Sequence, residues 1–125
     1  MIVTMPHIHL EYSENLQPLD VKGTLTALNR AFFESGYVSD INDIKSRAVC
    51  QQNYVIGLGE ASGEAYLHVK VSLLSGRSTA VQQEISALLL NVLQQQVPPH
   101  AGLRIQMCVE MLEMNKETYS KQVVK

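Results

Sequence analysis

The feature that most constrains the fold is a pair of apolar stripes that repeat at the same spacing, sixty positions apart. In each stripe the apolar residues stand at i, i+4, i+7 and i+11, which is typical of a helix with one face on a core. The first stripe is Val21, Leu25, Leu28 and Phe32, and the second is Val81, Ile85, Leu88 and Val92. This repeat indicates two copies of one structural unit.

Residues at the ends of the stripes are suited to cap helices. Asp20 can accept hydrogen bonds from the first free N–H groups, and Gly36 can adopt the left-handed conformation that ends a helix. Before the second stripe, Ser78 or Thr79 is the expected cap, and Thr79 with Gln82 would form a capping box. We therefore expect one helix between residues 20 and 36 and a second that begins near residue 79.

Each predicted helix lies between two segments in which apolar and polar residues alternate, the period of a half-buried strand. These segments span about residues 6–12, 44–50, 65–74 and 103–111. The order strand, helix, strand therefore occurs twice, and each half predicts a βαβ unit with parallel strands. The predicted fold is α+β, with two βαβ units forming a four-stranded mixed sheet and both helices on one face.

A chain of 125 residues suits one domain, which we expect to span residues 1–125. Residues 1–5 would be an N-terminal extension, and residues 115–125 form a polar tail without a clear period. Two helices on one side leave the other face of the sheet uncovered. Self-association is the simplest way to cover it, and Met107 or Leu112 could supply contacts.

Composition excludes some classes of partner. The net charge of −2 offers no broad basic field for nucleic acid or an anionic membrane surface. No apolar run approaches the roughly 20 residues that cross a bilayer. Cys50 and Cys108 have apolar neighbours, so we expect inert, buried free thiols and a reducing, cytoplasmic location.

Three cationic residues stand where a small carboxylate could be bound. Lys45 and Arg47 are two positions apart on one predicted strand, so they share a face, and Arg77 comes just before the second helix. An arginine beside a helix N-terminus adds a bidentate donor to free N–H groups and the positive end of the dipole. The alternative is that these side chains are solvated or form weak surface ion pairs.

The order of four short motifs resembles a known family. Met5-Pro6-His7 opens an alternating strand, and it is followed by the segments 44–49, 66–69 and 75–78, which read IKSRAV, YLHV and SGRS. In order and spacing they resemble 5-carboxymethyl-2-hydroxymuconate isomerases of the tautomerase superfamily, over residues 6–119. The resemblance implies two βαβ units assembled as a homotrimer. It also implies a cofactor-free isomerisation of a carboxylated dienol in homoprotocatechuate breakdown.

The resemblance also implies roles for particular residues. Pro6 would be the general base and acid through a secondary amine, whose pKa must lie near the working pH. Arg77 would hold a carboxylate or stabilise a developing dienolate oxygen. Lys45 stands where the family has an arginine and lacks its planar fork, whereas Arg47 matches a neighbouring position. His7 is a further expected substrate-binding residue.

The residues before Pro6 decide whether this chemistry is available. With Met1 to Met5 in place, the nitrogen of Pro6 is an unreactive amide. If synthesis begins at Met5 and this methionine is removed, Pro6 carries a free amine that titrates near about 7.7 to 8.0 when unperturbed. The alternative from another class is a non-catalytic oligomer with the tautomerase fold, which binds small carboxylates while the extension blocks Pro6.

Two other kinds of site are weaker readings of the sequence. His7, His9 and Glu11 share one face of a strand, and with His68 they could resemble a metal site, although the resembled family uses no cofactor. The glycines at 57, 59 and 63 miss the dinucleotide-binding pattern, because a serine stands where the third glycine is due. A hairpin loop is the expected structure there.

Overall fold

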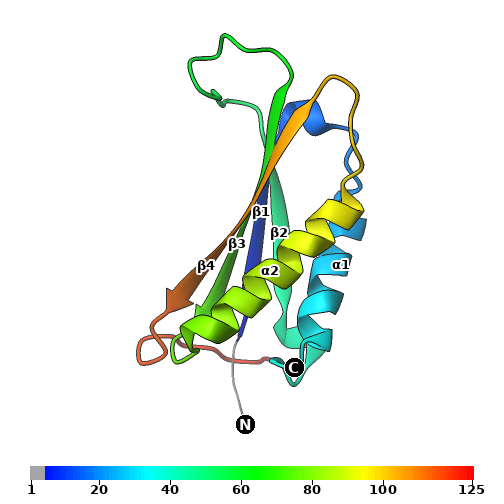
Figure 1. Ribbon diagram of the computed structural model, residues 1–125. Coiled ribbons are helices and arrows are strands. Elements are labelled where there is room, and N and C mark those ends of the chain that lie inside the picture. The colour runs from blue at the N-terminus through cyan, green and yellow to red at the C-terminus, as the bar shows by residue number, and fades with distance from the viewer. Residues whose placement is uncertain (1–4) are drawn as a thin grey trace.

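A four-stranded mixed sheet carries two helices on one of its faces (Figure 1). The computed structural model describes residues 5–125, so the predicted extension lies outside the described residues except for Met5. The strands are β1 (His7–Ser13), β2 (Lys45–Gln51), β3 (Glu64–Leu74) and β4 (Arg104–Met114). The helices are α1 (Val21–Glu34) and α2 (Thr79–Gln96), with short 3-10 turns η1 (Glu14–Leu16) and η2 (Ile41–Asp43).

The strand order β2-β1-β3-β4 confirms the two predicted βαβ units. β1 is parallel to β2, and β3 is parallel to β4. The two units join through β1 and β3, which are antiparallel and place His7 opposite Ser72. As a result, the start of β1, the start of β2 and the end of β3 all lie at the same end of the sheet.

The helix ends follow the sequence in part. The Asp20 carboxylate accepts from the Gly23 N–H at 3.0 Å, and Gly36 follows α1 with a φ of 88°. At the start of α2 the cap is Ser78, one of the two expected residues, whose hydroxyl accepts from the Val81 N–H at 3.2 Å. The expected capping box is absent there, because the Gln82 side chain donates to the Arg77 carbonyl at 3.2 Å instead.

The core lies between the sheet and the helices, and α2 is rotated slightly from the predicted stripe. Ile85 and Val92 are buried as expected, but Leu89 and Leu93 are completely buried and Leu88 is only half-buried. The reason is that α2 packs both on the sheet and against α1, and Leu88 faces the seam between the helices. Within residues 5–125, no helix combines the length and the apolar character needed to cross a membrane.

The face of the sheet away from the helices carries polar side chains in rows. His7, His9 and Glu11 project from β1, with Arg47 from β2 and Lys70 from β3 beside them. On β4, Leu112 does point outward and is 39% exposed. The expectation for Met107 is wrong, because its side chain packs against the core.

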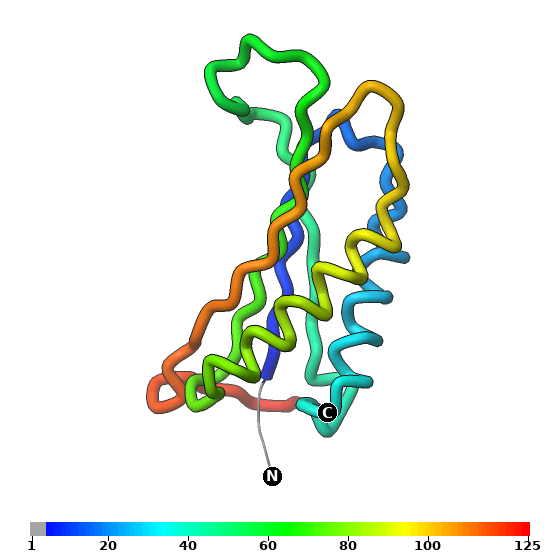
Figure 2. The backbone as a smooth tube through the Cα atoms, in the orientation of Figure 1, coloured from blue at the N-terminus to red at the C-terminus, as the bar shows by residue number. Residues whose placement is uncertain are grey.

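A long loop and the C-terminal tail cross opposite ends of the sheet (Figure 2). Residues 52–63 join β2 to β3 across the end of β1, so this loop is no hairpin between neighbouring strands. At the opposite end, the tail that follows β4 passes the start of β1 on its way toward α1. Tyr119 and Lys121 of this tail contact His7 and Asp43. The tail therefore covers the end of the sheet that holds Pro6.

Candidate active site

Pro6 immediately precedes β1 and is buried at the end of the sheet. Its carbonyl accepts a hydrogen bond from the Lys45 N–H at 3.2 Å, which ties the starts of β1 and β2 together. Met5 before it has a φ of 44°, in the left-handed region that residues with a side chain adopt only at a cost. The chain is therefore well anchored from Pro6 onward and strained just before it.

Arg47 holds the two histidines of β1 in fixed positions. Its Nη2 lies 2.9 Å from His7 Nδ1, and its Nη1 lies 3.0 Å from His9 Nε2. A guanidinium can only donate, so both imidazole nitrogens must accept and both rings are neutral. His7 Nε2 then carries its proton and donates to the Tyr119 hydroxyl at 3.0 Å. Both nitrogens of His7 are thus occupied.

The electrostatic surroundings agree with neutral histidines. Burial lowers the pKa of His7 below its ordinary 6.5, and the charges of Arg47, Lys45 and Lys121 lower it further. Burial and then Arg47 also lower the pKa of His9, while Glu11 acts weakly in the opposite direction. At neutral pH the positive charge of this cluster is therefore carried by arginine and lysine.

Lys121 completes the cluster from the C-terminal tail. Its Nζ lies 3.1 Å from Asp43 Oδ1 and 3.2 Å from the sulfur of Met5, and its side chain is 29% exposed. Sequence reasoning missed both Lys121 and Tyr119, because neither lies in a periodic segment or in a motif. The only signal for them was the length of the polar tail, which does not say where the tail goes.

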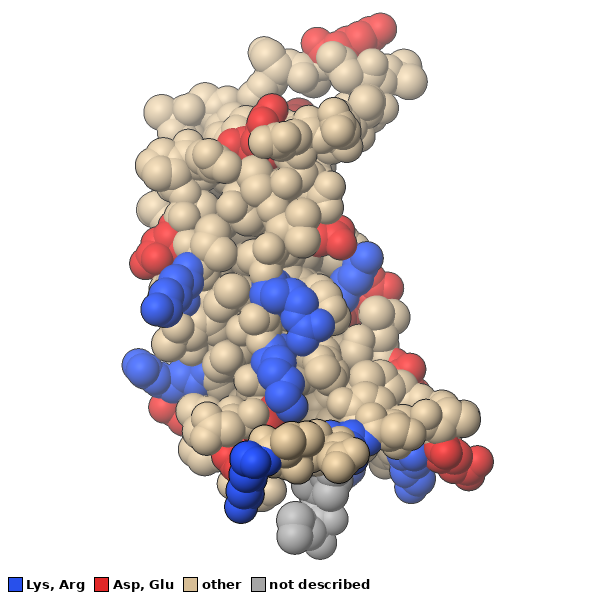
Figure 3. Space-filling model, turned by 180° about the vertical axis from the view of Figure 1, so that it is seen from behind, with Lys and Arg blue, Asp and Glu red and all other residues tan. Residues whose placement is uncertain are grey.

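Cationic side chains gather in the middle and lower part of the open face, the end at which β1 starts (Figure 3). Lys45 and Arg47 stand on β2 beside the histidines, and Lys70 on β3 pairs with Glu11 at 3.7 Å. The chain as a whole is slightly acidic, so this concentration is local. A patch of this kind can bind a small anion with several carboxylates.

Most of the residues singled out in the sequence come together. Pro6, His7, Lys45 and Arg47 are linked by backbone pairing and by the contact between Arg47 and His7. Arg77 lies in the β3–α2 connection at the same end of the sheet and is half-buried. Because β2 and β3 flank β1, Lys45 at the start of β2 and Arg77 after the end of β3 lie on opposite sides of β1.

The structure also bears on the metal site, the glycine-containing segment and the two thiols considered from the sequence. Among residues 5–125 no group of three or more His, Cys, Asp or Glu side chains could hold a metal ion, and His68 pairs with Glu110 at 2.9 Å. The glycine-containing segment leads into β3 and not into a helix, as a dinucleotide-binding loop would. The prediction that both thiols are buried is wrong for Cys108, which is exposed, while Cys50 is half-buried.

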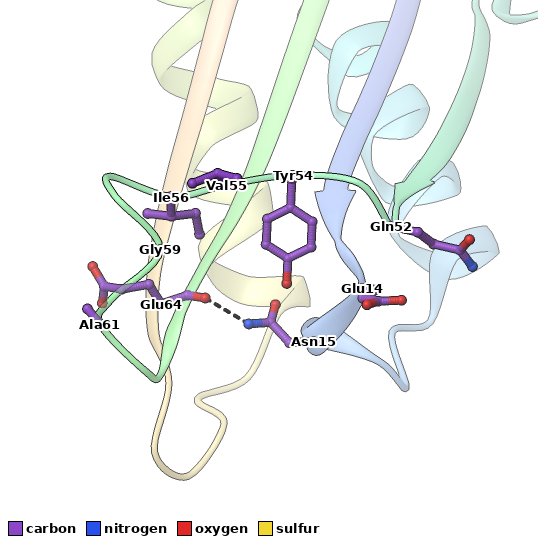
Figure 4. Close-up of a pocket in the computed structure, with 9 residues that line it drawn as sticks. All are labelled: Glu14, Asn15, Gln52, Tyr54, Val55, Ile56, Gly59, Ala61 and Glu64. Atoms are coloured by element: carbon purple, nitrogen blue, oxygen red, sulfur yellow. Dashed lines mark hydrogen bonds between the residues drawn. The ribbon is translucent and has the colours of Figure 1, made fainter.

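A hollow of 440 Å³ lies at the far end of the sheet, beyond the end of β1 (Figure 4). Its lining residues are Glu14, Asn15, Gln52, Tyr54, Val55, Ile56, Gly59, Ala61 and Glu64. Asn15 donates to the Glu64 carbonyl at 2.7 Å, and the Glu64 carboxylate pairs with Arg104 at 3.0 Å. The length of β1 separates this acidic hollow from Pro6, so it is no part of the cationic cluster.

Solved structures share this fold over almost the whole chain. A 5-carboxymethyl-2-hydroxymuconate isomerase from Deinococcus radiodurans R1 has a TM-score of 0.87 at 24% identity, covering 97% of this chain and 91% of that one. A 5-carboxymethyl-2-hydroxymuconate delta-isomerase has a TM-score of 0.82 at 20% identity, covering 97% and 89%. A structure described as a fused 4-OT symmetric trimer has a TM-score of 0.69 at 18% identity, covering 89% and 87%. The fold is that of the tautomerase superfamily.

The family can be stated more narrowly from the sequence. Residues 6–124 match the family model described as 5-carboxymethyl-2-hydroxymuconate isomerase, so the chain belongs to this family of isomerases. The resemblance carried by the sequence motifs is therefore confirmed. A search of curated proteins found no match. The family match begins at Pro6, the residue that follows Met5 with its left-handed φ.

Proposed function

We propose that this isomerase carries out a cofactor-free keto-enol tautomerisation of a 2-hydroxymuconate-type dienol, such as 5-carboxymethyl-2-hydroxymuconate, with the Pro6 amine as acid and base. The observation that carries the proposal is the position of Pro6, which immediately precedes β1 and starts the family match, at the end of the sheet where cations gather. A neutral amine next to fixed positive charges is suited to accept a proton from an acidic enol and to release it again.

In the proposed reaction the proton moves from oxygen to carbon by way of Pro6. The amine removes the proton of the 2-hydroxyl group, whose oxygen becomes a carbonyl as the double bonds shift along the conjugated chain. The prolyl ammonium then returns the proton to a distant carbon of the substrate, which leaves an unsaturated ketone and a neutral amine. Nearby cations lower the pKa of the ammonium, which brings both steps within reach near neutral pH.

Each cationic residue would bind a different part of the substrate. Arg47 uses two N–H groups to hold His7 and His9 and keeps its remaining donors for a substrate carboxylate. Lys45 supplies a single ammonium from two positions earlier on the same strand. Arg77 lies on the other side of β1 and would stabilise a second carboxylate or the enolate oxygen. His7, with both nitrogens engaged, acts by orienting Arg47.

The proposal requires that the active chain begin at Pro6. A chain started at Met5 would lose this methionine and expose the secondary amine. The left-handed φ of Met5 supports this start, because a residue with a side chain adopts that conformation only at an energetic cost. With residues 1–5 attached, the Pro6 nitrogen has no lone pair available for proton transfer.

The test compares a chain that starts at Pro6 with the 125-residue chain, using a 2-hydroxymuconate-type dienol and following its conversion by ultraviolet absorbance. We expect turnover from the shorter chain and at least a hundredfold less from the longer one, since general acid-base catalysis contributes roughly 10²- to 10⁴-fold. Proton transfer by the shorter chain at only the solvent rate would refute the proposal. Carboxylate binding without turnover would instead favour the non-catalytic alternative.

We further propose that the enzyme is a cytoplasmic homotrimer. The uncovered face of the sheet and the exposed Leu112 support an oligomer, and one structural relative is described as a symmetric trimer. Light scattering of the purified protein should give three times the chain mass of 13.9 kDa. A monomer at micromolar concentration would contradict this part of the proposal.

A further inference from the structure

We propose that Lys121, a residue of the C-terminal tail, binds a substrate carboxylate beside Pro6 and is a further specificity-determining residue of this isomerase. The inference rests on the proposed function and deepens it. It goes beyond the residues that the sequence motifs single out, because Lys121 lies 116 positions from Met5, the residue it contacts. The geometry around its ammonium carries the inference.

Met5 marks the space that a substrate would enter. Its carbonyl carbon is bonded to the Pro6 nitrogen, so in a chain that starts at Pro6 the volume of Met5 is vacated directly in front of the amine. Lys121 Nζ lies 3.2 Å from the Met5 sulfur and therefore borders that volume. Whatever replaces Met5 in front of Pro6 comes within reach of the ammonium.

The ammonium has donors to spare for such a ligand. A lysine has three N–H donors, and the contact with Asp43 Oδ1 at 3.1 Å uses one of them. Loss of Met5 leaves open the side of the ammonium that contacts the Met5 sulfur. A substrate carboxylate placed there would form a charge-assisted hydrogen bond, which is stronger than a neutral one.

Asp43 holds Lys121 in this position from η2, just before β2. The pair is partly exposed, with side-chain exposures of 29% for Lys121 and 24% for Asp43, so it adds little to stability by itself. Tyr119, two residues earlier, fixes the tail a second time through His7. The tail is thus held at two points, at His7 on β1 and at Asp43 just before β2.

The charges of Lys121 and Asp43 act on Pro6 in opposite directions. Lys121 disfavours the prolyl ammonium and lowers its pKa, whereas Asp43 favours the ammonium. Other charged and titratable groups at this end of the sheet include Lys45, Arg47, Arg77 and Lys116, with Asp40, His7, His9 and Tyr119. These groups are common to all variants below, so a difference between variants reports on the Lys121–Asp43 pair.

The experiment uses the chain that starts at Pro6 and compares Lys121→Met with Asp43→Asn. Lys22→Met is the control for loss of one positive charge, because Lys22 is exposed on the first turn of α1 at the far end of the sheet. The measurements are kcat and KM for the dienol, the pH of the acidic limb of kcat/KM, and the affinity for adipate, an unreactive dicarboxylate, by calorimetry. Lys121→Arg tests whether the charge alone restores binding.

We expect Lys121→Met to raise KM and the adipate dissociation constant about tenfold, the usual loss for one charge-assisted hydrogen bond. Lys121→Met should also move the acidic limb of kcat/KM to higher pH by about half a unit. Asp43→Asn should move this limb to lower pH and leave the affinity for adipate unchanged. Lys121→Arg should recover most of the affinity, and Lys22→Met should match the parent.

Equal losses in Lys121→Met and Asp43→Asn, with shifts of the same sign, would show that the ion pair only fastens the tail and would overturn the inference. Unchanged KM and adipate affinity in Lys121→Met, or no adipate binding by the parent chain, would overturn it as well. The proposed function fails separately, through lack of turnover by the parent, and in that case the adipate measurements still decide the role of Lys121.

Discussion

Replacement of Arg47 by alanine should separate the binding role of this cluster from its structural role. Arg47 contacts His7 Nδ1 at 2.9 Å and His9 Nε2 at 3.0 Å, and its side chain is otherwise exposed. A hydrogen bond from a charged group to a substrate is worth about 1.5 to 3 kcal/mol. Because about 1.36 kcal/mol corresponds to tenfold in rate, kcat/KM of the Pro6-start chain should fall by roughly 10- to 100-fold.

The same change should alter the histidines without unfolding the protein. The charge of Arg47 lowers the pKa of His7 and the pKa of His9. Its removal should therefore raise both pKa values toward 6.5. The free energy of unfolding should change by less than about 1 kcal/mol, since Arg47 is exposed. Proton NMR of the imidazole C–H signals gives the pKa values, urea unfolding gives the stability, and steady-state assays give kcat/KM.

Arg30→Ala is the matched control, because Arg30 is an exposed arginine on α1. It should leave kcat/KM and both histidine pKa values unchanged. The reasoning is refuted if Arg47→Ala stays within twofold of the parent in kcat/KM, which would remove Arg47 from the site. Unchanged histidine pKa values would show that the contacts between Arg47 and the two rings are absent in solution.

Three further predictions test other parts of the molecule. Arg77→Ala should lower kcat/KM by about 10- to 100-fold with an unchanged circular dichroism spectrum, and an unchanged rate would remove Arg77 from the site. Leu89→Ala should lower the free energy of unfolding, measured in urea, by about 2 to 5 kcal/mol, because Leu89 is fully buried. Leu112→Ala should lower it far less, because Leu112 is 39% exposed. Equal losses in the two variants would contradict the packing of α2. The folded state depresses the pKa of His7 and His9, so their contribution to stability is present above about 6.5 and is lost as pH falls through the folded values. The urea midpoint of the parent chain should therefore drop between pH 7 and pH 5, and that of His7→Gln should drop less. An equal drop in the parent and in His7→Gln would contradict the contribution of His7.

The fold was predictable because its signals are local. The apolar period of each helix and the alternation of each strand are set by neighbours within a few residues, and the repeated order fixes the two parallel pairs. The predictions for Met107 and Cys108 were wrong because the alternation along β4 was not used to decide which face each of them is on. Met107 and Val109 pack against the core, so Cys108 between them must face outward, although its apolar neighbours suggested burial.

The site was predictable only where it coincided with strand ends and family motifs. Pro6, Lys45 and Arg47 occupy fixed positions on paired strands, so their proximity follows from the topology. Tyr119 and Lys121 reach the same place from a tail without a period, and their partners are more than seventy positions away. Only the path of the folded chain brings such residues together.

Titration of the Pro6 amine is the decisive test of whether Pro6 acts through a free amine whose pKa is lowered by nearby cations. In a Pro6-start chain labelled with ¹⁵N-proline, only Pro6 carries an amine nitrogen, so its NMR signal is distinct from those of the other prolines. We expect a pKa below the ordinary 7.7 to 8.0 of an α-amino group, equal to the value from the acidic limb of kcat/KM. A pKa at or above the ordinary range, or one that differs from the kinetic value, would contradict it.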